Sequence, residues 1–425
     1  MKAYNAEIIS VGTELLLGQV ANTDSRDLSE MLSQIGINVL YHTVVGDNPE
    51  RMERCIEIAR ERADIIITTG GLGPTCDDLT KQLLAKSFGL ELVMDEEEKA
   101  GLYDYMTNRG YSHDMTENNL QQAMLPEGCT KFHNNWGTAP GCAFEKDGKI
   151  CIMMPGPPKE INPMFRAYAI PYLRRLSDEQ IVSHEIRVFG TSESKMDDML
   201  RDYMNTLTNP TMAPYAKEAD CMLRVTAKAK TVEEAEEMMA PVMKRAQELL
   251  GDTVYGVDVS CLEERVMELL KEKRMTFAAA ESCTGGDIAR RFTEMAGASE
   301  FFLGGVVSYT NGVKAGILGI DPDLIEEKTA VSYEVASLMA ENIRAITGAD
   351  LGVSVTGIAG PDDDGVHRVG DIFVALAVPE ETFVKELHLG RQRTRSYLRR
   401  VAGNFVYDMM RRYLTGMDVN ALKGE

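Results

Sequence analysis

Short apolar runs alternate with amphipathic segments of helix length over roughly the first 170 residues of this chain. Strands that are joined by helices favour a parallel sheet whose two faces are both covered. The pattern therefore predicts a doubly wound α/β domain, which we bound at residues 1–172. Its strands are expected at 6–12, 37–45, 64–70 and 149–156, with helices at 22–35 and 49–63.

The same alternation returns near the end of the chain and predicts a second α/β domain at 258–425. A hairpin with one exposed face is expected late in this domain. A basic helix that begins at Arg391 should close it, and its arginines are expected on a solvated face. Strands are expected at 275–282, 301–310, 351–357, 371–379 and 382–390, and helices at 261–273 and after the capping residue Ser332.

The stretch between these domains, 173–257, has a different pattern. Two runs of alternating polarity, 184–190 and 221–230, are typical of strands with one buried face, and an acidic helix is expected at 232–250. The proline-containing segment 209–216 reads as a break between them. The sequence therefore predicts a small α+β module.

The net charge argues against several classes of partner. Lys and Arg number 45 against 66 Asp and Glu, which gives a formal charge of −21. Such a surface repels nucleic acid and anionic membranes, so neither is expected as a partner. No long apolar run or signal peptide is evident, and a cytoplasmic location is expected. The cysteines are scattered without a C-x-x-C spacing, so neither a disulfide framework nor a zinc finger is predicted.

A glycine-rich turn with two carboxylates, TGGLGPTCDDLT, directly follows the strand expected at 64–70. Glycines let the backbone approach an anion closely, and the helix that follows offers free amides. Asp77 and Asp78 could hold a hard cation that bridges phosphate oxygens. Glu14 and Asp24, after the first strand, could face the same edge of the sheet. The alternative is a plain link in which one aspartate only caps the helix.

A second constellation places Ser282 at the end of an apolar strand, with Thr-Gly-Gly opening the next helix. Backbone amides after such a serine form a ready oxyanion site. No histidine lies within 80 residues in sequence, although His367 could approach through space. Lys314, in YTNGVK after the neighbouring strand, could act as a neutral amine. The alternative makes Ser282 a helix cap and Lys314 a surface charge.

Each of the two residues next to Ser282 has a possible role of its own. Cys283 is a rival nucleophile, for which a buried structural thiol is the expected role. Glu281 could orient the lysine or accept a substrate amide.

The motifs of the first domain, taken together and in order, resemble the molybdopterin-binding-like domain of the CinA (competence/damage-inducible protein A) family. They are GTELLLG, NTDS, TTGGLGPTCDDLT, NNLQQAMLP, GTAPG and MPGPPKE, of which the last three are expected in loops. The resemblance implies metal-dependent hydrolysis of ADP-ribose at its pyrophosphate. Gly70, Gly71 and Gly73, with Thr75, would then contact phosphate. A divalent metal would be held by Asp78, with Glu14 and Asp77 helping.

The middle module is similar to the KH-like linker of that family. The RNA clamp of a KH domain is a G-x-x-G loop, and this tetrapeptide is absent between 176 and 257. Its main helix is acidic as well. A spacer or dimer contact is therefore expected, with the whole protein a homodimer.

The last domain also resembles the CinA family, through AESCTGG, YTNGVK, AVS and TGIAGP. Domains with this set are nicotinamide-nucleotide amidohydrolases, which convert nicotinamide mononucleotide to nicotinic acid mononucleotide and ammonia without a metal. By resemblance, Ser282 is the nucleophile, Lys314 the general base and Tyr309 a support of the proton relay. The other residues implied are Glu281, Thr284, Gly285 and Gly286 around the reacting group, and Thr356, Gly357, Ala359 and Gly360 in a second ligand wall.

Two departures from the family pattern leave the phosphate contact open. PDDDGVHRVG stands where the family has P-D-G-G-x-x-x-K-P-V-G, and the closing helix offers several arginines, of which Arg393 is our choice. A different class of function also stays open: a regulatory protein that binds nucleotides or pterins in competence or damage control without catalysis. Pterin or nucleotidyl transfer at the first site is a third option.

Overall fold

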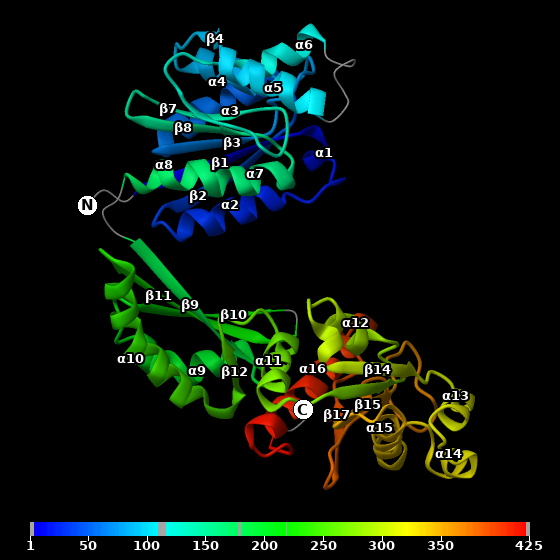
Figure 1. Ribbon diagram of the computed structural model, residues 1–425. Coiled ribbons are helices and arrows are strands. Elements are labelled where there is room, and N and C mark those ends of the chain that lie inside the picture. The colour runs from blue at the N-terminus through cyan, green and yellow to red at the C-terminus, as the bar shows by residue number, and fades with distance from the viewer. Residues whose placement is uncertain (1–3, 109–115, 177–179, 218, 422–425) are drawn as a thin grey trace. The chain divides into compact units, whose positions relative to one another are not determined.

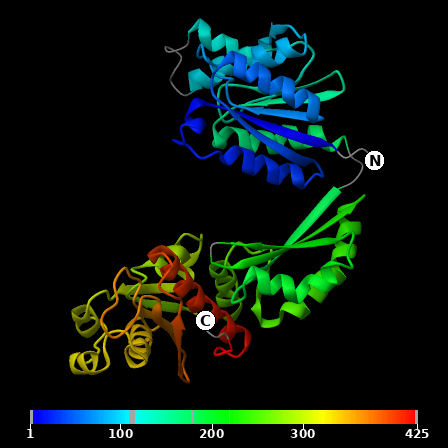
Figure 2. The ribbon, with the colours of Figure 1, turned by 180° about the vertical axis from the view of Figure 1, so that it is seen from behind.

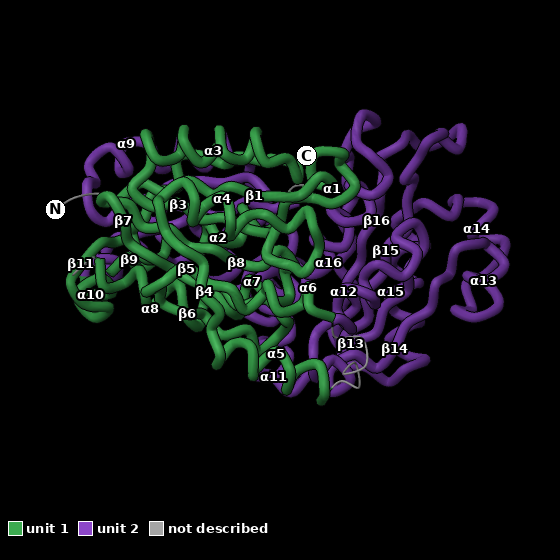
Figure 3. Tube along the Cα trace, turned by 90° about the horizontal axis from the view of Figure 1, so that it is seen from above, with its two compact units in different colours: residues 1–182, 227–237 green, residues 183–226, 238–425 purple. Residues whose placement is uncertain are grey.

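The computed structural model describes residues 4–108, 116–176, 180–217 and 219–421. It divides into two compact units, residues 1–182 with 227–237 and residues 183–226 with 238–425 (Figure 3). None of the helices in these described stretches is long and apolar enough to span a membrane. The domain boundaries expected from the sequence stay predictions.

The first unit contains a six-stranded mixed sheet in the order β2-β1-β3-β8-β7-β6. The first four strands in this order are parallel, as predicted, but β7 pairs antiparallel with β8, and β6 pairs antiparallel with β7. The reversal occurs at Asp147 and Gly148, whose φ angles of 53° and 72° suit a two-residue hairpin turn. The strands are β1 (Asn5–Val11), β2 (Asn38–Val45), β3 (Ile65–Thr69), β6 (Thr130–Phe132), β7 (Gly141–Lys146) and β8 (Lys149–Met154).

Both faces of this sheet are covered by helices (Figures 1 and 2). Alternate residues of β1 supply the two cores: Ile8 packs into one apolar cluster and Ile9 into the other. Asn22 and Asn48 cap α2 and α3 with their side-chain oxygens. One face carries α2 (Thr23–Ser33) and α7 (Pro158–Met164), and the other carries α3 (Pro49–Arg62) and α4 (Thr80–Ser87).

The segment 117–128, expected to be a loop, contains short regular elements. Glu117–Leu120 forms helix α6, and Met124–Pro126 forms strand β5, which pairs with β4 (Leu92–Met94). Elements of three or four residues are too short to show a periodicity, so no sequence pattern predicts them. The helices α1 (Thr13–Leu16), α5 (Glu96–Asn108) and α8 (Ile170–Arg174) complete this part of the chain.

The middle module forms a four-stranded sheet in the order β10-β11-β9-β12. The break predicted at 209–216 is wrong, because Thr211–Ala216 is strand β10 and pairs antiparallel with β11. Pro214 fits there since β10 is an edge strand. The other elements are β9 (Gln180–Val188), α9 (Glu193–Met204), β11 (Cys221–Ala229), α10 (Val232–Leu250) and β12 (Val254–Val257).

The last domain is built on a five-stranded sheet in the order β14-β13-β15-β16-β17. The first three strands are parallel, and the last two form the predicted antiparallel hairpin. The exposed face expected for this hairpin is confined to the edge strand, since β16 is buried on both sides. The strands are β13 (Phe277–Glu281), β14 (Phe302–Val307), β15 (Leu351–Gly357), β16 (Asp371–Ala377) and β17 (Thr382–His388).

Helices cover both faces of this sheet too. The closing helix α16 begins at Arg395 rather than Arg391. Its far end is not a solvated basic face: Arg411 and Arg412 are buried and both pair with Asp408. The helices α11 (Leu262–Lys273), α12 (Asp287–Thr293) and α16 (Arg395–Thr415) pack on one face, and α15 (Tyr333–Thr347) packs on the other, with α13 (Asn311–Gly316) and α14 (Pro322–Lys328) nearby.

Candidate active sites

Ser282 and Lys314 meet at the carboxyl edge of the last domain's sheet. Ser282 directly follows β13, and Lys314 lies on α13, which follows the neighbouring strand β14. The strand expected at 301–310 ends earlier, at Val307, because Thr310 caps α13 with its hydroxyl. Parallel strands place their carboxyl ends side by side, so residues 32 positions apart come into contact.

The lysine amine donates to the serine hydroxyl. Lys314 Nζ lies 2.9 Å from Ser282 Oγ and 2.8 Å from the carbonyl oxygen of Ser308. Lys314 is 1% exposed, and burial lowers its pKa below the usual value. Within the described ranges, no carboxylate forms an ion pair with it. The geometry is that of a serine next to an amine that can lose its proton.

Backbone amides surround this serine, but not all are available. The Gly285 amide, expected to contact the reacting group, donates to the Ser282 carbonyl oxygen at 3.0 Å. The amides of Cys283, Thr284 and Gly286 have no acceptor among the residues that the structure describes. Thr284 is buried, and its hydroxyl oxygen has no hydrogen-bond partner there either. The oxyanion donors are therefore better sought at 283, 284 and 286.

Glu281 has a different place from the one predicted. Its side chain is buried, and its two carboxylate oxygens accept from the amides of Ile288 and Ala289 at 3.1 and 2.9 Å. Negative charge is favourable at the first turn of a helix. Glu281 therefore anchors α12 and does not orient Lys314 or face a substrate.

The arginine that approaches the site is not Arg393. The guanidinium of Arg393 lies over the ring of Tyr397, 4.9 Å from its centroid. Arg395 instead donates to the Tyr309 hydroxyl at 2.8 Å and to the Gly360 carbonyl. Arg399, one helical turn on, donates to the Thr284 carbonyl oxygen at 2.9 Å. The four-residue spacing of these two arginines on α16 was a signal that sequence reasoning missed.

Tyr309 is 56% exposed and bonds Arg395, with no hydrogen bond to Ser282 or Lys314 in the described chain. The structure therefore places it at the mouth of the site. A position near the leaving or phosphate group suits it better than a place in the proton relay.

The second ligand wall is only partly as predicted. The Thr356 hydroxyl donates to the Ala330 carbonyl oxygen at 2.7 Å, so this side chain holds the neighbouring loop instead of facing a ligand. Gly357 is needed for packing, since a Cβ there would lie 2.7 Å from the Ile372 Cα. Ala359 is buried, and Gly360 has a φ of +82° and offers its carbonyl to Arg395.

The surroundings of Cys283 and His367 argue against Cys283 as the nucleophile and against His367 as the base. Cys283 is buried, and burial raises its pKa to about 12, so it is a thiol at neutral pH. His367 bonds the carboxylate of Asp364 and makes no hydrogen bond with Ser282 in the described chain.

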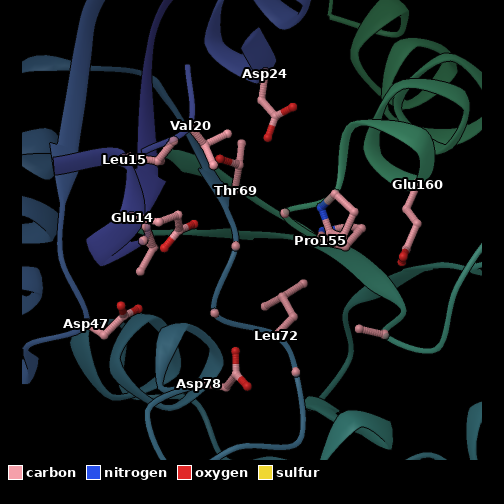
Figure 4. A pocket seen from close by; sticks show the side chains of 18 of the residues that line it. Glu14, Leu15, Val20, Asp24, Asp47, Thr69, Leu72, Asp78, Pro155 and Glu160 are labelled. Carbon is pink, nitrogen blue, oxygen red and sulfur yellow. The ribbon is translucent and has the colours of Figure 1, made fainter. Parts of the chain in front are cut away.

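The first domain has a separate cavity of about 550 Å³ over the glycine-rich turn. Among the described residues, no Lys, Arg or His lines it. Figure 4 shows carboxylates from several elements arranged around its walls. The acidic residues that line the cavity are Glu14, Asp24, Asp47, Asp77, Asp78 and Glu160.

Within the turn, two of the four residues predicted to contact phosphate, Gly70 and Thr75, are engaged internally. The Gly70 amide donates to the Met154 carbonyl oxygen at 3.0 Å, and a Cβ on Gly70 would lie 2.4 Å from the Val11 carbonyl oxygen. Thr75 donates to Asp78 from its amide, at 2.9 Å, and from its hydroxyl, at 2.6 Å, and that hydroxyl also contacts Asp77.

Gly70 and Thr75 therefore build the turn. The amides of Gly71 and Gly73 have no acceptor in the described part of the chain, so they remain candidates for phosphate. A Cβ on Gly73 would lie 2.5 Å from an Asp78 carboxylate oxygen, which explains the glycine there.

Asp24 is the most perturbed carboxylate of this cavity. Burial, and then the charge of Asp27, raise its pKa to about 6. Its buried Oδ1 has no hydrogen-bond partner among the described residues. A buried carboxylate oxygen without a partner, on a side chain that lines a cavity, is a position that a cation or a donor group would satisfy.

The carboxylates of this cavity suit a metal ion only if the phosphate of a bound ligand supplies part of its coordination shell. The described residues contain no group of three His, Cys, Asp or Glu that could hold a metal. Glu14, Asp77 and Asp78 do line the same cavity as the glycine amides. Mg²⁺ typically uses one or two carboxylates and completes its shell with water and phosphate oxygens, and the carboxylates here suit that arrangement.

Comparison with protein-family models assigns a family to each part of the chain. Residues 7–175 match a probable molybdopterin binding domain. Residues 183–256 match the KH domain of the damage-inducible protein CinA, and residues 259–414 match the CinA C-terminal domain.

Relatives of similar length carry matching names. A putative competence-damage inducible protein from Caldanaerobacter subterraneus is 46% identical over 97% of this chain and 99% of its own length. A CinA-like protein from Dictyoglomus thermophilum is 46% identical over 92% of this chain and 94% of its own. A solved structure of CinA from Thermoplasma acidophilum, of unknown function, is 35% identical, with a TM-score of 0.36, and covers 39% of this chain and 96% of its own.

Proposed function

Because the chain belongs to the CinA family, we propose that its last domain is an amidohydrolase that acts on nicotinamide mononucleotide. The observation that carries the proposal is the 2.9 Å contact between Lys314 Nζ and Ser282 Oγ in a buried setting. A protein that only senses nucleotides needs no serine activated by an amine. The contact therefore favours catalysis over the regulatory alternative.

The proposed reaction proceeds in two balanced steps. Lys314, as a neutral amine, takes the Ser282 proton while Oγ attacks the carboxamide carbon. The amides at 283, 284 and 286 would stabilise the oxyanion. Lys314 then gives the proton to the leaving nitrogen, which departs as ammonia and leaves an ester on Ser282. Water, deprotonated by the same amine, hydrolyses the ester to nicotinic acid mononucleotide and restores the serine.

Arg395 is the group we assign to the substrate phosphate, in place of Arg393. It is exposed on the first turn of α16 and lies beside Tyr309 and Gly360 at the rim of the serine site. A guanidinium can bind phosphate through two donors. It would exchange its present neutral partners for the charged oxygens.

Replacing Arg395 with alanine should raise KM for nicotinamide mononucleotide about 10- to 100-fold, with a smaller fall in kcat. The reason is that hydrogen bonds to a charged group contribute about 1.5–3 kcal/mol, mostly to binding. Arg393→Ala is the matched control and should leave KM within about twofold, because Arg393 lies on Tyr397. Steady-state ammonia release measures both. A larger effect of Arg393→Ala than of Arg395→Ala would assign the phosphate contact to Arg393 instead.

For the first domain we propose metal-dependent hydrolysis of ADP-ribose at its pyrophosphate, again on the strength of family membership. A pyrophosphate would meet six acidic side chains in this cavity and, among the described residues that line it, no Lys, Arg or His. Anions bind at free amides, but repulsion from six acidic side chains must be offset by a cation. A divalent metal held by Asp78 with Glu14 or Asp77 would, when bound, neutralise the charge on the phosphate oxygens.

Chelation of divalent metal should stop ADP-ribose cleavage by more than about 100-fold and leave ammonia release unchanged. The physical reason is that the proposed pyrophosphate lies among acidic side chains in the first cavity, so a cation must offset the repulsion there. The proposed reaction at Ser282 uses an amine and no metal. Assays of both reactions before and after EDTA, and after Mg²⁺ is returned, measure the effect. Loss of both activities together would contradict the assignment of two independent sites.

A further inference from the structure

Two cysteines of the first domain lie next to each other on the hairpin of β6 and β7. Cys142 is in β7, where it pairs with Lys131 in the antiparallel ladder. Cys129 comes two residues before Lys131, between β5 and β6, and therefore lies on the same face of the hairpin as Cys142. Both side chains pack against one apolar cluster. Their thiol groups are in hydrogen-bond contact, and neither is part of a disulfide.

The two thiols differ in exposure and in acidity. Cys129 is partly exposed, whereas Cys142 is 1% exposed. The hydrogen bond from Cys142 lowers the pKa of Cys129, and the charge of Lys131 adds to this effect against burial and the charge of Asp95. The same hydrogen bond, and then burial, raise the pKa of Cys142. Cysteines that react with oxidants are accessible, have a low pKa and lie beside a second cysteine. Cys129 suits the first role and Cys142 the second.

Two other cysteines lack this combination and serve as internal references. Cys151, on β8, packs into the same apolar cluster, but it is 0% exposed and burial raises its pKa strongly. Cys76 is exposed in the glycine-rich turn, and its thiol forms no hydrogen bond with another cysteine in the described part of the chain. A peroxide can reach Cys76, but a disulfide within the chain requires a neighbouring thiol.

The segment between Cys129 and Cys142 forms part of the wall of the first cavity. Thr138 and Ala139 line that cavity. Thr138 is also held from the opposite side, since its hydroxyl oxygen accepts from Gln122 Nε2 at 3.1 Å. A bond between Cys129 and Cys142 would close a loop that contains both wall residues. Closing a loop removes conformational freedom from the chain within it.

We propose that Cys129 and Cys142 are a redox modification site, at which a peroxide converts the two thiols into a disulfide that restrains the cavity segment 133–140. The Cys129 thiolate attacks a peroxide oxygen, the O–O bond breaks, and a sulfenic acid forms; the released hydroxide takes up the proton that Cys129 had lost. The Cys142 sulfur then attacks the sulfenic sulfur. The S–S bond forms as the S–O bond breaks, and the hydroxyl leaves with the Cys142 proton as water. The thiols are oxidised, the peroxide is reduced to water, and neither proposed activity is required.

Peroxide treatment of the full-length protein, followed by denaturation, alkylation of free thiols and tryptic digestion, tests the site. Trypsin cleaves after Lys131, so the peptides that hold Cys129 and Cys142 stay joined only through a disulfide. Mass spectrometry should show the joined peptide as the main product, and dithiothreitol should abolish it.

Two serine variants sharpen this experiment. In Cys129→Ser, peroxide should leave Cys142 free, because the attack begins at Cys129. Cys76→Ser removes an exposed thiol elsewhere and is the matched control, which should give the wild-type yield of the joined peptide. The proposal is overturned if peroxide oxidises Cys76 in the wild-type protein while Cys129 and Cys142 both stay free, or if Cys142 joins Cys151 instead.

Hydrogen exchange on the oxidised and the reduced wild-type protein measures the link to the cavity. The disulfide should slow amide exchange in residues 133–140 several-fold, because both ends of that segment are then restrained. Exchange in residues 281–286, which belong to the other unit, should stay the same and is the internal control. Equal exchange of 133–140 in both forms would overturn the proposed restraint.

Discussion

Ser282→Ala should lower ammonia release from nicotinamide mononucleotide by at least about 10³-fold and leave the fold intact. The loss is large because the hydroxyl forms the covalent bond to the carboxamide carbon, and no other group can replace it. The substitution removes the contact between Oγ and Lys314. The fold should persist because the Ser282 amide still donates to the Val355 carbonyl oxygen. Product analysis and thermal unfolding measure the two effects.

Cys283→Ala is the control for this experiment, since the thiol is the next residue and the rival nucleophile. Its pKa of about 12 keeps it protonated at neutral pH, so we expect activity within a few-fold of wild type. If Cys283→Ala lost as much activity as Ser282→Ala, or if Ser282→Ala remained active, the serine mechanism would be refuted.

Lys314→Met should lower the rate about 10²- to 10⁴-fold, the range that a general base contributes. Methionine keeps the length of the side chain in its buried position but cannot accept the serine proton. Lys314→Arg should be comparably inactive, because a guanidinium keeps the charge but does not deprotonate. An active arginine variant would show that Lys314 supplies charge rather than basicity.

The wild-type pH profile should follow the same lysine. Burial favours the neutral amine and lowers the Lys314 pKa below its usual value of 10.5. Because the neutral amine is the active form, kcat/KM should rise with pH up to that lowered pKa and fall as pH drops through it. This limb should vanish from the residual activity of Lys314→Met.

The sequence predicted the meeting of Ser282 and Lys314 because that contact follows from topology. Neighbouring parallel strands end at one edge, so the residues just after β13 and β14 must be close. The mixed order of the first sheet was missed although Asp147-Gly148 is a strong hairpin signal between two short strands. The family comparison then showed the fold class of all three parts.

Side-chain direction was harder to predict than position. Glu281 was expected to face the substrate, but the amides of Ile288 and Ala289 draw its carboxylate beneath α12. Arg393 and Arg395 are two residues apart on opposite sides of a helix start, and only the register of α16 decides which one reaches the site. Both outcomes depend on tertiary neighbours that no local pattern contains.

The contact between Arg399 and the Thr284 carbonyl has a consequence for biosynthesis. It joins residues 115 positions apart, and it braces the turn that carries the nucleophile with a helix that is synthesised later. A ribosome releases Ser282 and Lys314 well before α16 has emerged. The turn that carries Ser282 therefore gains this brace only after α16 has been synthesised.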